Sequence, residues 1–165
     1  MSEQPKEIQT VQSAVEALRA TSLFGGLREE HLHRLAALTE VQTFSRGHSV
    51  FKEGDIGDRF YFIMEGRIRI SRQIPGMGEE ALTILAKNSY FGEMALIDDQ
   101  ARSADAIVHE KATLMSLKKR DLEDLLFVDR DAAYDILWAF VRTLSARLRE
   151  TSDKLTFLTV TSKFG

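Results

Sequence analysis

Glu93 and Arg102 are two charged side chains whose types and spacing could bind a small anionic ligand. Arginine carries a fork of N–H donors that matches phosphate oxygens, and an ionised carboxylate accepts a hydrogen bond from a hydroxyl such as a ribose 2′-OH. Gly92 allows a close approach to the backbone, and residues 93–97 are predicted to form one helical turn whose free N–H groups suit a phosphate. This pattern predicts a nucleotide pocket. From spacing alone, an ordinary ion pair between Glu93 and Arg102 beside a turn explains it equally well.

Length and composition limit the kind of molecule that holds this segment. The chain has 165 residues, a formal charge of −3 and 44% hydrophobic residues, which fits one compact domain with a real core. The weakly acidic balance gives no electrostatic reason to bind nucleic acid or an anionic membrane. No stretch without a charged residue exceeds eight residues, so we expect neither a membrane span nor a secretory signal. The absence of cysteine favours a cytoplasmic location.

Helical periodicity marks both ends of the chain. Apolar residues recur at helical spacing over 5–20 and again over 27–38, with a glycine break between the two runs. After residue 118 the helical period returns, with a short helix capped by Asp121 and ending at Phe127, followed by a long helix over 131–158. We therefore expect helices on both sides of a central β region.

The central region consists of short strand-like runs. Residues 67–72 alternate polar and apolar side chains, as a half-buried antiparallel strand does. Many short strands separated by glycine-containing turns are typical of a barrel or sandwich. The predicted class is thus α+β, a small antiparallel β-barrel flanked by helices. The predicted strands are 41–44, 49–51, 59–64, 67–72, 81–85, 105–109 and 113–117.

The segment 91–104, Phe-Gly-Glu-Met-Ala-Leu-Ile-Asp-Asp-Gln-Ala-Arg-Ser-Ala, closely resembles the phosphate-binding cassette of the cyclic nucleotide-binding domain family. The strand and glycine pattern of 51–68 and the entry helix around 23–35 are also similar to this family. The resemblance covers about residues 20–160. It implies a jelly-roll-like barrel with a short cassette helix and three parts: an N-terminal helix (1–22), the ligand-binding barrel (23–130) and a C-terminal lid or dimerisation helix (131–160).

The resemblance also implies roles for single residues. Glu93 would accept from the ribose 2′-OH and Arg102 would pair with the cyclic phosphate. Gly92, Ala95 and Ser103 would lie against the sugar-phosphate, and Ser103 suits a cAMP receptor or a cGMP receptor. The remaining cassette positions expected at the ligand are Phe91, Met94 and Ala104.

The long C-terminal helix carries a heptad seam with one polar member. A seam of this length favours helix–helix dimerisation, and we expect its first part to pack on the chain's own barrel. The segment 147–154 resembles the central helix of the catabolite activator branch of the family. That resemblance implies that Thr151 and Ser152, one from each protomer, bind the base, that Arg147 approaches Glu93, and that the ligand is cAMP. Thr151 could instead only set the register of the seam. The seam positions are Leu137, Val141, Leu144, Leu148, Thr151, Leu155 and Leu158.

These observations predict a cyclic nucleotide receptor, not an enzyme, without a cofactor or metal. We expect it to bind cAMP, with cGMP as the alternative, and to signal through the C-terminal helix to an unidentified downstream protein. A second possibility is the ligand-binding domain of a longer transcription regulator, since no DNA-reading helix follows residue 158. A remote alternative is a metal-dependent barrel enzyme, but His31 and His33 lie in an expected helix, where solvent-exposed histidines are usual, and His48 and His109 are isolated.

Overall fold

The computed structural model describes the backbone of residues 4–163 and the side chains of residues 11–94 and 97–162. Five helices and six strands follow one another along this part of the chain. They are α1 (Gln4–Arg19), α2 (Glu29–Ala36), β1 (Thr39–Phe44), β2 (Ser49–Phe51), β3 (Arg59–Ile74), β4 (Gly78–Ala86), β5 (Tyr90–Phe91), α3 (Met94–Ile97), β6 (Asp105–Lys118), α4 (Lys119–Val128) and α5 (Arg130–Lys163).

The strands form one rolled antiparallel sheet, which confirms the predicted α+β class. The hydrogen-bonded path runs β1-β6-β3-β4, with β2 paired to β6 and β5 paired to β3. Among the described residues this path stays open between β1 and β4. The runs predicted at 59–64 and 67–72 are one bulged strand, β3, and those at 105–109 and 113–117 are one strand, β6.

Gly66 explains how β3 continues where two strands were expected. Its φ of +83° lies in the left-handed region that glycine readily adopts. A Cβ at this position would lie 2.2 Å from the backbone oxygen of Lys111 on β6. Glycine therefore lets the two long strands stay paired across the bulge.

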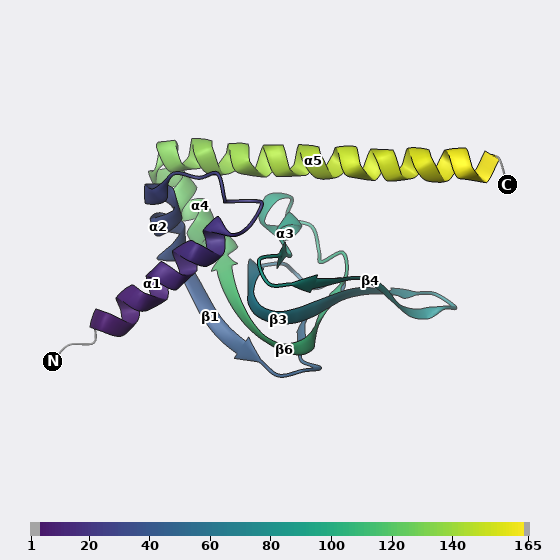
Figure 1. Ribbon diagram of the computed structural model, residues 1–165, viewed down its shortest axis with the longest axis horizontal. Coiled ribbons are helices and arrows are strands. Elements are labelled where there is room, and N and C mark those ends of the chain that lie inside the picture. Colours follow the sequence, from purple (N-terminus) through teal and green to yellow (C-terminus); the bar gives the residue numbers. More distant parts are fainter. Residues whose placement is uncertain (1–3, 164–165) are drawn as a thin grey trace.

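The hydrophobic core has two parts. One fills the interior of the rolled sheet and includes Ile63, Ile68, Phe91 and Leu114. The larger part joins the sheet to the helices, with Phe24, Phe60, Phe62 and Phe140 forming edge-on and tilted ring contacts. Figure 1 shows α1, α2 and α4 at one end of the sheet, with α5 running above it and the β3–β4 hairpin extending in the same direction as the end of α5.

Helix α5 differs from the prediction in which face it buries. Its buried residues are Ala132, Ile136 and Phe140, spaced four residues apart. The seam residues that begin at Leu137 lie on the neighbouring face, and the six apolar members of the seam are 39–68% exposed. The expectation that the first part of the seam packs on the chain's own barrel is therefore wrong.

The start of α5 is fixed to α2 by a charged cluster. Arg28 donates to Asp131 at 2.6 Å and to Asp135 at 2.8 Å, and His31 Nδ1 lies 3.1 Å from the Asp135 carboxylate. His31 is only 1% exposed, so the expectation that it is solvent-exposed is wrong. The imidazole tolerates burial because carboxylates surround it.

Two smaller findings concern the helices. Helix α4 begins at Lys119 with Lys118 in the capping position, so Asp121 lies in the first turn and does not cap the helix. Over the described part of the chain, no helix combines the length and apolarity that crossing a bilayer requires.

Candidate functional site

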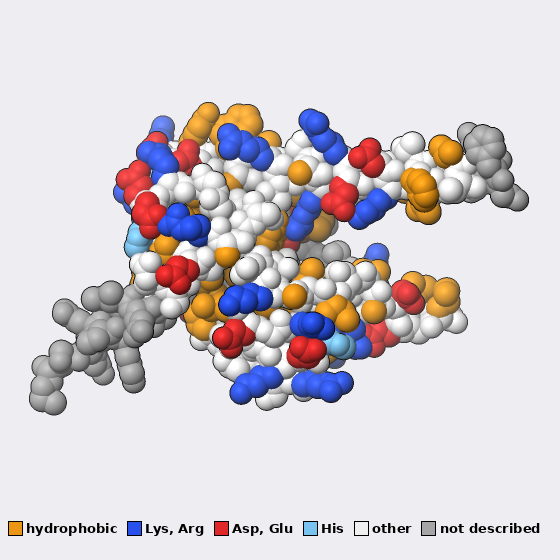
Figure 2. Space-filling model, in the orientation of Figure 1, with side chains coloured by type: hydrophobic (Ala, Val, Ile, Leu, Met, Phe, Trp, Pro, Cys, Tyr) orange, Lys and Arg blue, Asp and Glu red, His pale blue; other side chains and the backbone are white. Residues whose placement is uncertain are grey.

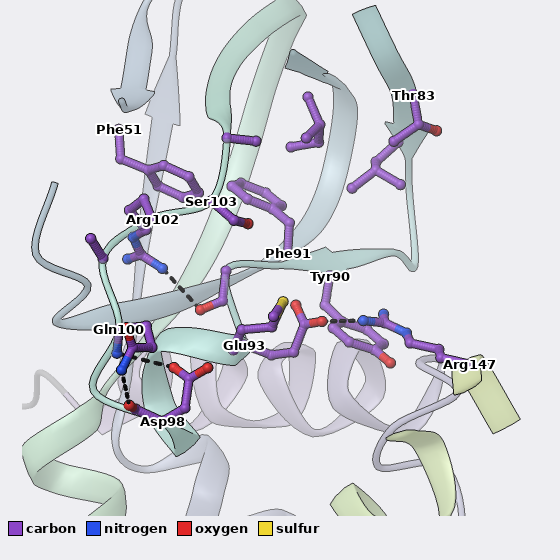
Figure 3. Close-up of a pocket in the computed structure, with 16 residues that line it drawn as sticks. Phe51, Thr83, Tyr90, Phe91, Glu93, Asp98, Gln100, Arg102, Ser103 and Arg147 are labelled. Carbon is purple, nitrogen blue, oxygen red and sulfur yellow. Dashed lines mark hydrogen bonds and ion pairs between the residues drawn. The ribbon is translucent and has the colours of Figure 1, made fainter. Parts of the chain in front are cut away.

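A cavity of about 430 Å³ opens between the cassette, the β3–β4 surface and α5. Figure 3 shows Arg102 and Phe51 at one end of it, Thr83 at the far end, and Glu93 between the cassette and α5. In Figure 2 a hollow is visible between α5 and the part of the molecule below it. The lining residues are Phe51, Ile70, Thr83, Leu85, Tyr90, Phe91, Gly92, Glu93, Met94, Asp98, Gln100, Ala101, Arg102, Ser103, Ala104 and Arg147.

Arg102 is a buried cation at one end of the cavity. It is 6% exposed and donates through two nitrogens to backbone oxygens, at 2.9 Å to Gly92 and 2.5 Å to Arg59. Its Nε has no hydrogen-bond partner. Burial lowers the pKa of Arg102, because removing water disfavours the charged form, although arginine remains protonated. Among the described side chains no carboxylate is close enough to form an ion pair with Arg102, and Asp58, Asp55 and Glu93 attract its charge only at longer range.

The backbone around Arg102 is fixed by the loop between β2 and β3. Gly54 N–H donates to the carbonyl of Arg102 at 2.9 Å, and Arg102 N–H donates to the carbonyl of Asp55 at 2.8 Å. Ile56 and Ala101 form an isolated antiparallel bridge beside them. The end of the cassette is thereby held against a second loop, which fixes where the guanidinium can lie.

Phe51, the last residue of β2, covers the guanidinium of Arg102. The Arg102 Cζ atom lies 4.1 Å from the centre of the Phe51 ring. Phe51 in turn contacts Tyr61 and Phe91 at 6.1 Å and 5.8 Å between ring centres, and the rings of Tyr61 and Phe91 stack at 5.2 Å. Burial raises the pKa of the Tyr61 hydroxyl. Three packed rings thus support one cation.

Glu93 is 7% exposed and forms an ion pair with Arg147 of α5. Arg147 also lies over the Tyr90 ring, with 4.9 Å between Cζ and the ring centre. A buried carboxylate needs such a partner. The expected approach of Arg147 to Glu93 is therefore present, and it connects the cassette directly to α5.

A glycine is required at position 92, next to Arg102 and Phe51. Its φ is +80°, and a Cβ there would lie 2.6 Å from a terminal nitrogen of Arg102 and 3.4 Å from the Phe51 ring. A side chain at this position would strain the backbone and displace the guanidinium.

The structure brings most predicted site residues to the cavity. Thr151 and Ser152 are exceptions, because both are exposed on α5 and lie outside the lining. The side chain of Ala95 lies outside the described residues. The predicted residues that line the cavity are Phe91, Gly92, Glu93, Met94, Arg102, Ser103, Ala104 and Arg147.

Several lining residues were not predicted. Thr83 and Leu85 lie on one face of β4, and the i, i+2 spacing within the predicted strand 81–85 already placed them together. Ile70 contributes from β3, and Tyr90 lies directly before the cassette. Phe51 ends a predicted strand, but its contact with Arg102 depends on pairing between β2 and β6, which the sequence does not specify.

Comparisons with known proteins identify the family of the chain. Residues 41–129 match the model of the cyclic nucleotide-binding domain. The chain is 32% identical over 146 residues to the "CRP-like cAMP-activated global transcriptional regulator" of Mycobacterium tuberculosis, which covers 88% of this chain and 63% of that protein. It is 33% identical over 102 residues to a cGMP-dependent protein kinase of Drosophila melanogaster, covering 61% of this chain and 13% of the kinase. The chain thus spans less than two thirds of the length of these relatives.

Solved structures give the same result. The N-terminal domain of a transcriptional regulator from Streptomyces coelicolor superposes with a TM-score of 0.73 at 33% identity, covering 84% of this chain and 94% of that one. A cyclic nucleotide-binding domain from Methylobacillus flagellatus gives a TM-score of 0.76 at 25% identity, covering 88% and 82%. The chain belongs to the cyclic nucleotide-binding domain family.

Proposed function

We propose that the chain is a cAMP receptor that couples ligand binding to the position of α5. The observation that carries this proposal is Arg102, a buried cation without a carboxylate partner among the described side chains, at the end of a cavity. A cyclic phosphate would supply the missing negative charge. Glu93 would accept from the ribose 2′-OH, and the base would then extend toward Thr83 and α5.

Selectivity for cAMP rests on α5. Arg147 of α5 lines the cavity, and the exposed residues Thr151 and Ser152 follow it on the same helix. Residues 141–162 contain no buried side chain, so burial does not fix this part of α5, and a movement toward a bound base would rearrange the ion pair between Arg147 and Glu93. The relative from Mycobacterium tuberculosis is described as cAMP-activated, which supports the same ligand.

A second copy of the chain would cover the exposed seam of α5. The seam presents six apolar residues at a/d spacing over three heptads, enough for a coiled-coil interface. In this register Arg147 takes a g position and Ser152 an e position. In a parallel pair a g residue lies beside the e residue five positions later on the other helix. Ser152 of one copy would therefore lie next to Arg147 at the other copy's cavity.

This geometry also explains why Thr151 and Ser152 lie outside the lining of a single chain. Thr151 is a seam residue and Ser152 lies on the far side of the seam from Arg147, so the two hydroxyls serve different cavities. We infer a parallel homodimer in the cytoplasm, acting on a downstream protein or domain, with no enzymatic activity of its own.

Calorimetric titration with cAMP and cGMP tests the function. We expect cAMP to bind in the micromolar range or tighter, and more tightly than cGMP. Arg102→Ala should weaken binding about 30-fold or more, because losing a charge-assisted contact to a buried phosphate costs about 2–5 kcal/mol. Arg72→Ala is the matched control, since Arg72 is exposed and pairs with Glu53 away from the cavity.

The outcomes separate the alternatives. Tighter binding of cGMP would assign the receptor to that nucleotide. Equal affinity of the Arg102→Ala variant and the control would remove Arg102 from the site, and no binding of either nucleotide would overturn the proposed function.

A further inference from the structure

We propose that Phe51 is a positioning residue for Arg102, and that its ring face holds the guanidinium for the ligand without neutralising it. This inference rests on the proposed function, in which Arg102 meets the cyclic phosphate. Phe51 lies outside the cassette, 51 positions along the chain from Arg102, and reaches it from the end of β2.

The cost of burying Arg102 shows why a partner is needed. A buried charge is unfavourable unless it is compensated. Two backbone oxygens compensate part of this cost. A further close neighbour of the guanidinium is the Phe51 ring, whose centre lies 4.1 Å from Cζ. A cation over an aromatic face is stabilised by the negative charge density of that face, more strongly when water is excluded.

An aromatic ring leaves the N–H donors of a guanidinium free, whereas a carboxylate partner occupies them. The N–H groups of a guanidinium point outward in the plane of the group, whereas an aromatic face contacts the group from above that plane. A carboxylate would occupy the in-plane donors and cancel the charge, so it would compete with an incoming phosphate. Phe51 does neither, and Arg102 keeps its Nε unpaired and its charge available.

The ring is itself held in place. Phe51 is packed against Phe91 and Tyr61, which stack on one another. Gly92 leaves room for both the ring and the guanidinium, because a Cβ there would meet both. The orientation of Arg102 is therefore fixed by the rolled sheet and does not depend on the ligand.

A purely space-filling role for Phe51 is the alternative, and a ring-to-aliphatic substitution separates the two. Phe51→Leu keeps an apolar side chain but removes the ring face. Phe51→Tyr keeps the face. Phe44→Leu is the control, because Phe44 packs against the same core and contacts His48, not Arg102. Each variant is titrated with cAMP, alone and combined with Arg102→Ala.

We expect Phe51→Leu to weaken cAMP binding roughly 3- to 30-fold, while Phe51→Tyr and Phe44→Leu stay within about twofold of the unaltered protein. In the Arg102→Ala background Phe51→Leu should have no further effect, because the group it positions is gone. Unchanged affinity in Phe51→Leu, or the same loss with and without Arg102, would overturn the proposal. If Phe51→Leu does not fold, Phe51→Met gives the same comparison with an unbranched, more flexible side chain of similar volume.

A ligand-free measurement keeps this test separate from the proposed function. The Nε–Hε signal of Arg102 in ¹⁵N NMR should carry a ring-current shift that disappears in Phe51→Leu and remains in Phe51→Tyr. An identical Nε–Hε shift in Phe51→Leu and the unaltered protein would refute the contact itself. If the shift behaves as expected but no cyclic nucleotide binds, the proposed function fails while the contact between Phe51 and Arg102 stands.

Discussion

The two halves of α5 are attached to the rest of the molecule in different ways. The first half, residues 130–143, buries Ala132, Ile136 and Phe140 and is fixed to α2 through Arg28. The second half, residues 144–163, contacts the ligand-binding part of the chain through Arg147. The first half therefore contributes to folding stability. The second half has no buried side chain up to residue 162, and under the proposed function it is the part that a ligand or a second copy would move.

The largest effect that this comparison predicts is on assembly. Leu148→Glu should give monomers, because it places two like charges face to face in an apolar seam, and burying each charge costs several kcal/mol. Light scattering at about 100 μM measures the change. Arg149→Glu is the control, since it places the same carboxylate at the next position, outside the seam. If the unaltered protein is monomeric with and without cAMP, the seam does not pair.

The free energy of unfolding should depend mainly on the first half of α5. Ile136→Ala should lower the free energy of unfolding by about 2–5 kcal/mol, because it leaves a cavity in place of a fully buried side chain. Val160→Ala, which is half exposed and lies outside the seam, should change it by no more than about 0.5 kcal/mol. Urea denaturation compares the two. Similar losses in both variants would mean that the second half is packed as firmly as the first.

Arg147 is the contact that limits motion of the second half. Arg147→Ala should increase hydrogen exchange across residues 144–158 in the ligand-free protein roughly tenfold, matching about 1.4 kcal/mol for a lost charged contact. Arg149→Ala removes a neighbouring charge that does not pair with Glu93 and serves as the control. Equal exchange in all three proteins would show that the ion pair with Glu93 does not restrain α5.

A smaller effect is expected at the base. Thr151→Ala should weaken cAMP binding by about 1 kcal/mol, the value of one hydrogen bond, and leave the contacts to ribose and phosphate intact. Thr156→Ala is a matched control, because the Thr156 hydroxyl donates to the Ser152 carbonyl within its own helix, at 2.9 Å. Unchanged affinity in Thr151→Ala would limit Thr151 to setting the register of the seam.

The smallest effect concerns pH and the fixed start of α5. Hydrogen bonding to Arg28 lowers the pKa of Asp135, with His31 adding to the shift. The unfolded chain then binds this proton more readily than the native state does, so the contribution to stability is present above the ordinary carboxyl pKa and is lost as the pH falls through the lowered one. Asp135→Asn should make the melting temperature depend less on pH between about pH 3 and 5. The same slope in the unaltered protein and the variant would argue against this contact.

The sequence predicted that the cassette residues lie together, because they are close to one another in the chain. Gly92, Glu93 and Arg102 lie within eleven consecutive residues, so their proximity requires only a short loop. Phe51 and Arg147 come from distant segments, and only the folded sheet and the path of α5 bring them to the cavity.

The wrong predictions about the buried face of α5 and the exposure of His31 have a similar origin. Helix α5 carries two neighbouring apolar stripes, one with Ile136 and one with Leu137, and periodicity does not tell which of them faces the sheet. The burial of His31 depends on Asp135, 104 residues further along the chain. A lone histidine in a helix gives no sign of such a partner.

The pairing of β3 with β6 has a consequence for how the binding site arises. This ladder runs from Arg59 opposite Lys118 to Ser71 opposite Asp105, so the whole cassette lies inside the loop that the ladder closes. The conformational entropy lost on closing such a loop must be overcome before the contacts between the strands stabilise it. Sheets built from distant segments therefore fold slowly. During synthesis the cassette therefore emerges from the ribosome before the strand that gives it its shape. Under the proposed function, we therefore expect a cyclic nucleotide to meet its site only after β6 has paired with β3.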